Sequence, residues 1–414
     1  MGDTDMARAN TPFSGLTVLD FSRYLPGGYA TQVLADLGAT VIKVEDTGLG
    51  DFMRHDYPTK GGGISYYITA LGRNKKSVSL NLKNEEVVEW FKKMAKEADV
   101  IVESFRPGVT KKLGIDYDTI NEINPRIIYC SISGYGSEDP RSKKAQHDLN
   151  MQATSGYLSV NHGSTSPLHL CDLSSGMVAG QAILAALYAR EQTGKGTYID
   201  TSMFDCFVWW NSLLDSRWCF NGGECKRDDL EYPSTAYNVY ETADGGKLAL
   251  GMVEAKFWEP FCDAIGHPEI KGDGLKRRWE APESFKIVED VIKSKPLDEW
   301  MEWLEDKDFC IAKVNSKTEA VEQITRENPE ALAWVDFPRV GRVLQTGLPH
   351  HLSTIPVNIA DFEEASVLGG DTAEYLKKVG ADDATIARLK AEGGIRLGDD
   401  IVPEEDRAPI APVQ

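Results

Sequence analysis

The first 136 residues repeat one pattern, in which a short apolar segment is followed by a helical segment and then by another apolar segment. The apolar segments are rich in β-branched residues, which favour buried strands, and apolar residues recur at helical spacing between them. The predicted strands are 15–22, 39–45, 76–82, 99–105 and 126–136, and the predicted helices are 29–38, 84–98 and 116–124. Strands joined through a helix run parallel. The pattern therefore predicts an open α/β sheet, which binds ligands at the carboxyl ends of its strands.

Composition and charge exclude several classes of protein. The chain has 414 residues, 42% of them hydrophobic, and a formal net charge of −19. This hydrophobic content predicts a folded chain with two domains or one large one. An acidic chain lacks the broad basic face that nucleic-acid binding requires. We expect no bilayer-spanning apolar run, and the polar start does not have the order of a signal peptide, so the chain is predicted to be cytoplasmic, without a membrane partner.

The cysteines argue against a disulfide framework and against a zinc site. Seven cysteines, an odd number, stand at positions 130, 171, 206, 219, 225, 262 and 310, without a Cys-x-x-Cys pair. This usage is typical of a reducing compartment. We therefore predict no bound metal.

The second half of the chain changes character. A helix is predicted from Asp172 to about Glu191, followed by an outer strand and an aromatic-rich helix at 207–220. A hairpin with an Asp-Gly-Gly turn is predicted at 237–252, and helices follow it. The tail contains two short amphipathic helices, with no internal repeat.

Three titratable residues stand where the chain enters a predicted helix. Asp172 precedes a buried helix, His147 opens a short one, and Glu254 lies between a strand and an aromatic helix. Each has an ordinary structural explanation: a helix cap for the two acids and a hydrogen-bonding role for the histidine. Together they would form an acid–base or nucleophile site. The residues alone leave both alternatives open.

A dinucleotide site is a weaker possibility. Gly27 and Gly28 precede a helix and Glu45 ends the next strand, but the spacing is not G-x-G-x-x-G, and no phosphate-binding P-loop motif occurs. Basic residues instead stand near strand ends, at Arg23, 73–76, Lys83 and Arg106. We predict that they converge at one sheet edge to bind phosphates.

Six segments, in order along the chain, resemble the family III CoA-transferase superfamily, which includes formyl-CoA transferase, carnitine CoA-transferase and 2-methylacyl-CoA racemase. The segments are "GLTVLDFSRYLPGGYATQVLADLGATVIKVE", "GRNKKSVSLNLK", "VESFRPGV", "LGIDYDTINEINPRIIYCSISGYG", "DLSSGMVAGQAILAALYAREQTGKGTYID" and "YETADGGKLALG". The resemblance implies a large Rossmann-like domain built from both chain ends, a smaller α+β domain, and two subunits threaded as interlocked rings. We accordingly expect a large CoA-binding domain at 1–220, a linker at 221–236, a small domain at 237–335 and a return segment at 336–414.

The resemblance also implies coenzyme A as the bound nucleotide, as part of an acyl-CoA substrate, with no metal and no NAD. Asp172 matches the acid that both branches of the superfamily use. The positions that match the family's CoA contacts are Leu80, Asn81, Leu82, Lys83, Ser104, Phe105, Arg106 and Lys112, to which we add Arg23. Many relatives carry Arg where this chain has Asp46, which weakens the match at that point.

Two activities follow from the resemblance. In a CoA-transferase, Asp172 attacks the acyl-CoA thioester, and CoA passes between carboxylic acids through an acyl anhydride and an enzyme-CoA thioester. In a 2-methylacyl-CoA or 2-aryl-acyl-CoA racemase, His147 and Asp172 are the two bases and Glu254 orients His147. The "HDLN" and "VEAKFW" segments are similar to the racemases, whereas "QATSG", "DLSSGM" and the chain length are similar to the transferases.

We predict a transferase, with the racemase as the alternative and a non-catalytic partner subunit as a minor one. The expected assembly is a homodimer, or a heterodimer with a related subunit.

Overall fold

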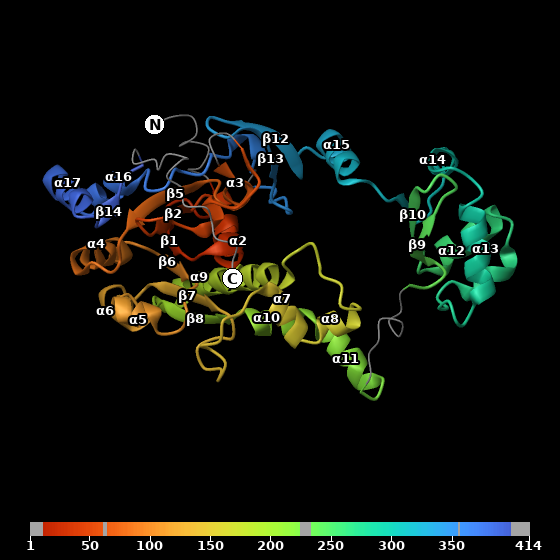
Figure 1. Cartoon of the computed structure of the whole chain (residues 1–414), viewed down its shortest axis with the longest axis horizontal. Helices are drawn as coiled ribbons and strands as arrows, with labels where there is room; N and C mark the ends of the chain where they lie inside the picture. The colour runs from red at the N-terminus through yellow and green to blue at the C-terminus, as the bar shows by residue number, and fades with distance from the viewer. Residues whose placement is uncertain (1–10, 61–63, 224–232, 355–356, 399–414) are drawn as a thin grey trace. The chain divides into compact units, whose positions relative to one another are not determined.

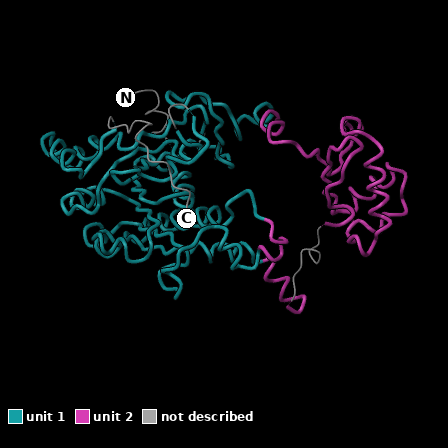
Figure 2. Tube along the Cα trace, in the orientation of Figure 1, with its two compact units in different colours: residues 1–157, 165–212, 324–414 teal, residues 158–164, 213–323 magenta. Residues whose placement is uncertain are grey.

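The computed structural model describes residues 11–60, 64–223, 233–354 and 357–398. The chain divides into two compact units (Figure 2). Unit 1 contains residues 1–157, 165–212 and 324–414, and unit 2 contains residues 158–164 and 213–323. Much of the predicted linker, residues 224–232, lies outside the described residues. The predicted domain boundaries stay predictions.

Unit 1 is built on a seven-stranded sheet with the order β14-β5-β2-β1-β6-β7-β8 (Figure 1). The strands are β1 (Thr17–Phe21), β2 (Thr40–Glu45), β5 (Lys75–Leu80), β6 (Val100–Glu103), β7 (Ile128–Ser133), β8 (Thr197–Ser202) and β14 (Ile395–Arg396). Neighbouring strands pair in parallel except β14, which pairs antiparallel with β5. The predicted open, largely parallel α/β sheet is thus confirmed. The chain builds outward from β1 to β5 and then returns to β6, so the strand order reverses beside β1, where such sheets bind ligands.

Helices and hairpins surround this sheet within unit 1. The helices are α2 (Tyr24–Asp36), α3 (Tyr66–Leu71), α4 (Glu85–Lys96), α5 (Val109–Leu113), α6 (Tyr117–Ile123), α7 (Asp148–Thr154), α9 (Leu170–Thr193), α10 (Met203–Trp210), α16 (Thr372–Lys378) and α17 (Asp383–Ala391), with short 3-10 turns at η1 (Phe52–Arg54) and η4 (Ile359–Asp361). The hairpins are β3 (Thr59–Lys60) with β4 (Ile64–Ser65), and β12 (Leu332–Phe337) with β13 (Gly341–Thr346).

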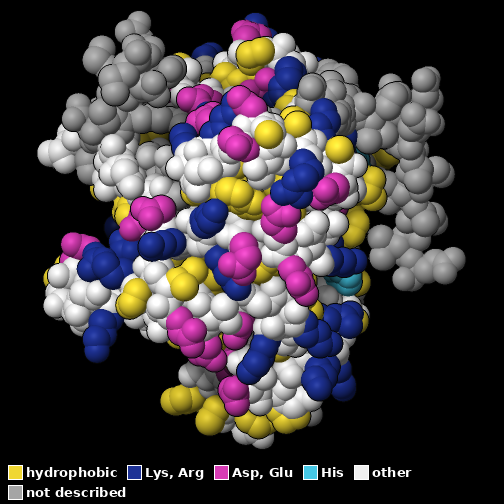
Figure 3. All heavy atoms as spheres, turned by 90° about the vertical axis from the view of Figure 1, so that its left-hand side faces the viewer, with side chains coloured by type: hydrophobic (Ala, Val, Ile, Leu, Met, Phe, Trp, Pro, Cys, Tyr) yellow, Lys and Arg dark blue, Asp and Glu magenta, His cyan; other side chains and the backbone are white. Residues whose placement is uncertain are grey.

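Two hydrophobic cores lie on the opposite faces of the sheet, because successive strand residues point to opposite faces. Leu19 of β1 packs with α4, α6, α16 and α17, whereas Val18 packs with α2 and α9. Both sequence ends of unit 1 therefore complete one core. Figure 3 shows the side of unit 1 on which α4 and α17 lie, where Lys and Arg side chains alternate with Asp and Glu rather than forming a basic face.

Local chemistry explains where α4 begins and ends. The side chain of Asn84 accepts hydrogen bonds from the backbone N–H groups of Glu86 and Val87, which satisfies donors that the helix cannot pair itself. Glu85 and Glu86 stand in the first turn and Lys93 and Lys96 in the last, as the helix dipole favours. The pattern of the sequence predicted this helix within two residues at each end.

Unit 2 is a small α+β body. Its sheet has the order β11-β10-β9, from β9 (Tyr237–Glu241), β10 (Lys247–Gly251) and β11 (Ile311–Lys313), all antiparallel. The predicted hairpin at 237–252 is therefore present. Helices α12 (Ala255–Ala264), α13 (Pro282–Ile292) and α14 (Leu297–Leu304), with η3 (Pro268–Asp273), supply the core around Trp258, Phe261 and Phe285. Each of the boundaries between the two units falls within or at the start of a helix, apart from the one at residue 165. These helices are α8 (Tyr157–Val160), α11 (Ser212–Phe220) and α15 (Lys317–Glu327).

Two sequence expectations need correction. The aromatic segment 207–220 is not one helix, because Asn211 closes α10 and α11 follows it. The expectation of no membrane-length apolar run is also wrong by length and composition alone, since α9 meets both criteria. Half of its apolar window is buried within the protein, where α9 packs on α2 and the sheet. That burial explains its composition.

Candidate active site

Asp172 lies in the first turn of α9, but it does not cap this helix. Asp148 of α7 supplies the cap from outside: its Oδ1 accepts hydrogen bonds from the backbone N–H groups of Cys171 (2.6 Å) and Asp172 (3.3 Å). The residue at the N-cap position, His169, makes no side-chain cap bond. The capping explanation of Asp172 is therefore wrong. Its carboxyl group is not needed to cap α9 and is available for a chemical role.

The surroundings of Asp172 disfavour its charge. Burial, and then the negative charge of Asp148, raise the pKa of Asp172 to about 7. Asp148 is itself buried, and its Oδ2 accepts a hydrogen bond from Nε2 of Gln152 at 2.5 Å. A carboxyl group that titrates near neutral pH suits a nucleophile or a base, because it is both available and reactive there.

Tyrosine rings complete this environment. Burial raises the pKa of Tyr29 on α2, and the charge of Asp172 adds to the effect. Asp172 acts in the same direction on Tyr67 of α3, more weakly than burial and the neighbouring Tyr66. The helix pair is close here: a side chain at Gly176 of α9 would place its Cβ 2.7 Å from Cβ of Tyr29. Sequence reasoning did not single out these tyrosines, because they lie far from Asp172 along the chain.

The other two predicted catalytic residues lie in different units. His147 precedes α7 and is exposed, and its side chain makes no hydrogen bond within the described part of the chain. Its neighbour Asp148 contacts α9, so the amino ends of α7 and α9 lie together in unit 1. Glu254 belongs to unit 2, at the N-cap position of α12, and makes no side-chain cap bond. The pairing of His147 with Glu254 stays a prediction.

A cavity of about 220 Å³ lies where the strand order reverses, at the carboxyl ends of β1, β2, β5 and β6. The predicted CoA-binding residues that line it are Arg23, Leu80, Asn81, Leu82, Lys83 and Phe105. Ser104 holds its edge by accepting a hydrogen bond from the backbone N–H of Arg23 at 2.8 Å. Arg106 lies in the same loop as Ser104, and Lys112 lies on α5, two residues of which also line the cavity. The structure thus brings these separate segments to one edge of the sheet.

Arg23 contacts groups of two kinds at this cavity. Its Nη2 lies 2.8 Å from Oδ2 of Asp46, and its guanidinium lies over the rings of Phe52 and Phe105. Asp46 stands where many relatives carry Arg, which weakens the family resemblance at that point. Here it places a carboxylate against the arginine, which reduces the positive charge that Arg23 offers to a phosphate.

Two basic residues predicted for the phosphate site serve the fold instead. Arg73 pairs with Asp36 at 2.7 Å, and Lys75 donates a hydrogen bond to Oγ1 of Thr31 at 2.7 Å, beside buried Asp20. Both are buried. They stand at the amino end of β5, whereas Lys83 follows its carboxyl end. Their predicted convergence with Arg23 and Arg106 is therefore wrong.

Glu45, which a dinucleotide site would use for a ribose, is likewise occupied. It is buried and pairs with Arg54 at 2.7 Å. Burial alone would raise the pKa of Glu45. Its favourable partners, Arg54 first among them, outweigh this effect and lower the pKa to about 2. This carboxylate is a structural ion-pair partner.

Asp148, His169 and Asp172 are also the one group of potential metal ligands with suitably close donor atoms in the described residues, within 4.8 Å of one another. The acceptor oxygens of Asp148 already bind the backbone of α9 and the amide of Gln152. This cluster is accordingly explained without a cation. The sequence did not identify His169 as a site residue, because its proximity to Asp148 arises only on folding.

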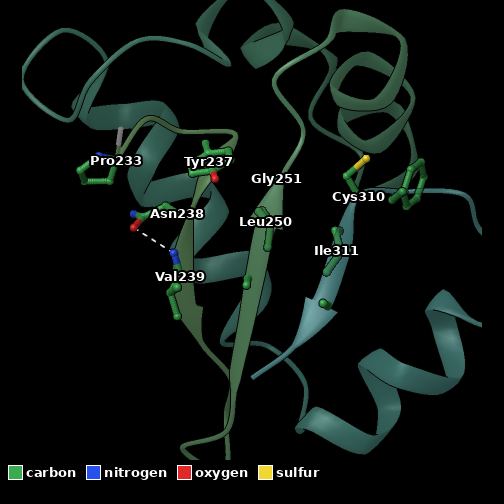
Figure 4. Close-up of a pocket in the computed structure, with 11 residues that line it drawn as sticks. Pro233, Tyr237, Asn238, Val239, Leu250, Gly251, Cys310 and Ile311 are labelled. Atoms are coloured by element: carbon green, nitrogen blue, oxygen red, sulfur yellow. Dashed lines mark hydrogen bonds between the residues drawn. The ribbon is translucent and has the colours of Figure 1, made fainter. Parts of the chain in front are cut away.

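Unit 2 has a cavity of its own, of about 710 Å³, on the sheet face of β9, β10 and β11 (Figure 4). Tyr237, Asn238 and Val239 line one side, and Cys310 and Ile311 the other. Gly251 lies in the cavity wall, at the end of the strand that leads to Glu254.

Known protein families and solved structures are similar to this chain over most of its length. The profile of CoA-transferase family III matches residues 13–371. The chain is 31% identical to the succinyl-CoA:glutarate CoA-transferase of Homo sapiens, over 92% of this chain and 89% of that protein. It is 31% identical to the formyl-CoA:oxalate CoA-transferase of Streptomyces avermitilis, over 92% and 98% of the two chains.

A racemase and a solved structure are also similar to this chain. Identity to the alpha-methylacyl-CoA racemase of Homo sapiens is 30%, over 91% of this chain and 96% of that protein. The crystal structure of a CAIB/BAIF family protein from Brucella suis superimposes with a TM-score of 0.77 at 25% identity, covering 89% of this chain and 100% of that one.

Proposed function

The chain belongs to CoA-transferase family III, and from this membership we propose that it transfers CoA reversibly between two carboxylic acids, with Asp172 as the nucleophile. The superfamily contains transferases and racemases. The observation that carries the proposal is the carboxyl group of Asp172, which is not used as a cap and whose pKa burial raises to about 7.

In the proposed reaction, Asp172 carries first the acyl group and then CoA. The Asp172 carboxylate attacks the thioester carbonyl carbon, the C–S bond breaks, and CoA thiolate leaves while Asp172 carries the acyl group as a mixed anhydride. The thiolate then attacks the Asp172 carbonyl carbon, which releases the first acid and leaves CoA as a thioester on Asp172. The acceptor carboxylate attacks this thioester, and the displaced thiolate takes the new acyl group from the second anhydride. The amino end of α9 favours the negative charge that develops at each step.

We further propose that the cavity beside β1 receives coenzyme A. Lys83, Arg106 and Lys112 are the cations proposed for its phosphates, and Leu80, Leu82 and Phe105 offer apolar surface to the nucleotide. Arg23 contributes less charge than the other cations, because Asp46 is paired with it. This assignment rests on the shared location of the residues at the point where the strand order reverses.

A racemase is the second candidate. The observation that favours it is the position of His147 directly before Asp148, whose carboxylate contacts the first turn of α9. His147 and Asp172 would then remove and return the α-proton of an acyl-CoA, with Glu254 orienting His147.

The proposal extends to assembly and location. We propose a homodimer, in which apolar side chains on unit 1 such as Tyr188 and Trp209, now 72% and 62% exposed, become covered. A heterodimer with a related subunit is the alternative, and the minor alternative of a non-catalytic subunit is disfavoured by the presence of Asp172. We propose a cytoplasmic location, consistent with the free thiols of the described cysteines.

One experiment separates the two activities. The protein is incubated in D₂O with succinyl-CoA or 2-methylacyl-CoA, with and without glutarate, oxalate or mesaconate, acids named in the relatives' activities. Mass spectrometry of the products is expected to show CoA on an added acid. Deuterium at the α-carbon without an acceptor acid would instead establish racemisation.

Variants provide the second test. Asp172→Ala is expected to abolish CoA transfer, and His147→Ala to keep most of it, because only a two-base racemase requires the imidazole. Initial rates measured with saturating substrates check both. Full CoA transfer by Asp172→Ala would remove the nucleophile assignment. A loss of about 100-fold or more in deuterium incorporation at the α-carbon by His147→Ala would favour the racemase.

A further inference from the structure

We propose that His169 binds the carboxylate of the acceptor acid next to Asp172, an inference that rests on the proposed transferase function. His169 stands three positions before Asp172, about one helical turn, and its side chain is 52% exposed. Its Nδ1 lies 4.0 Å from Oδ2 of Asp148. Its Nε2 lies 3.5 Å from the hydroxyl oxygen of Tyr67. Neither mechanism described above uses this side chain.

The fold does not account for a histidine here. His169 occupies the N-cap position of α9 without capping it, since Asp148 accepts the N–H groups of the first turn. The half-exposed ring therefore points to a role toward something that enters the site.

The reaction supplies a reason for a hydrogen-bond donor. An acceptor acid is an anion, and when Asp172 carries CoA as a neutral thioester the acid still approaches the carboxylate of Asp148, whose ligand oxygen lies within 4.8 Å of a His169 ring nitrogen. Repulsion between the two carboxylates would keep the acceptor away from the thioester. An imidazole N–H of His169 offsets this repulsion by donating a hydrogen bond to the acid.

Tyr67 adds a second hydrogen-bond donor. Its ring stacks on that of Tyr66, with centroids 4.1 Å apart, which fixes the hydroxyl group beside His169. An imidazole N–H and a phenol O–H side by side can each donate to one oxygen of a carboxylate. The pair would therefore hold the acceptor with its second carboxyl oxygen free to attack the thioester on Asp172.

The test compares donor and acceptor steps in the same full-length variant. The donor step is followed without any acceptor, as exchange of labelled free CoA into succinyl-CoA through the Asp172 anhydride. The acceptor step is followed as transfer to whichever of glutarate, oxalate or mesaconate the wild-type protein uses. His169→Gln is expected to raise KM for that acid about 10-fold or more, the loss of a charge-assisted hydrogen bond, with the exchange rate unchanged.

Three further proteins make the comparison specific. His169→Arg keeps an N–H donor at this position and is expected to restore KM for the acid toward the wild-type value. Tyr67→Phe is expected to raise that KM less than His169→Gln does. His351→Gln, which alters an exposed histidine beside Glu330 at 3.4 Å, is the matched control and is expected to change neither step.

Equal losses in both steps, or an unchanged KM for the acid in folded His169→Gln, would overturn the proposal. Calorimetric binding of the same acids gives a readout that needs no turnover. If His169→Gln binds an acid more weakly than the wild-type protein does but still binds coenzyme A, the result supports the proposal. If both proteins bind the acid equally, or the wild-type protein does not bind it, the result contradicts the proposal. Failure of the transferase function appears elsewhere, as absence of label exchange and transfer in the wild-type protein.

Discussion

At the scale of single residues, the site divides two tasks between two acids. Asp148 does the structural work, because it caps α9 from a neighbouring helix and is fully engaged in hydrogen bonds. Asp172 is thereby released from capping, and the charge of Asp148, after burial, makes its ionisation harder. A sequence pattern identifies an acid at a helix start but not which of two acids caps it.

The titration of Asp172 predicts how activity depends on pH. An aspartate nucleophile must be ionised, so kcat/KM is expected to rise as the pH increases through about 7, the pKa of Asp172. Asp148→Asn removes a negative neighbour, and this limb of the profile is expected to move to lower pH by roughly one unit. Burial is unchanged, so the limb should stay above the pH at which an exposed aspartate titrates.

The asparagine can be accommodated, because Oε1 of Gln152 is buried without a hydrogen-bond partner and can accept from the new amide after Gln152 rotates. The measurement is kcat/KM between pH 5 and 9 for both proteins. An identical limb in both would mean that a group other than Asp172 controls it.

At the scale of secondary-structure elements, the position of Asp172 depends on how closely α9 packs on α2. Gly176 allows this contact, since a Cβ there would lie 2.7 Å from Cβ of Tyr29 and 2.8 Å from the carbonyl oxygen of Pro26. Gly180, one turn further along the same helix, has no such restriction: its Cβ would lie 3.7 Å from the nearest atom, the carbonyl oxygen of Ala30. Both glycines are buried in the same interface.

This difference gives a matched pair of variants. Gly176→Ala is expected to lower the free energy of unfolding by about 1–3 kcal/mol, because overpacking pushes α9 away from α2, and to reduce kcat by displacing Asp172. Gly180→Ala is expected to be neutral or to stabilise by up to about 1 kcal/mol, since alanine favours helix and fits without a clash. Urea unfolding and initial rates test both, and equal effects of the two changes would refute the packing argument.

At the scale of the whole molecule, the end of the chain completes what the beginning starts. Leu376 of α16 and Leu389 of α17 lie in the same core as Phe91 of α4, and Arg388 pairs with Glu86 across this join at 2.6 Å. Strand β14 then pairs with the edge of β5. The central residues 213–323 form a separate body, so unit 1 must assemble from segments far apart in the sequence.

The proposed homodimer, with the interlocked rings that the family resemblance implies, makes a whole-molecule prediction. Light scattering after gel filtration is expected to give twice the chain mass of 45.8 kDa. Interlocked subunits can separate only if one of them unfolds. The dimer mass should therefore persist on dilution to nanomolar concentration, and dissociation should coincide with unfolding. An ordinary dimer would fall apart reversibly on dilution. A monomer at micromolar concentration would contradict the proposal and favour the heterodimer.

The amino-acid sequence by itself determined the local structure and the family. β-Branched runs, helical spacing and turn residues depend on near neighbours, so they predicted the parallel strands of unit 1, helix α4 and the hairpin of unit 2. Asp172 could be selected because its motif resembles a family. The two-residue strand β14 escaped prediction, since so short a segment carries no periodicity.

The tertiary structure decided which side chains meet. Arg73 and Lys75 belong to a basic run, yet folding buries them against Asp36 and Thr31 at the amino end of β5, because the partners that a side chain meets depend on how distant segments pack. Asp148 caps the helix of Asp172, and His169 and Tyr67 come together, for the same reason. Contacts between distant segments depend on the packing of the whole unit, whereas a local pattern reports only on residues a few positions apart.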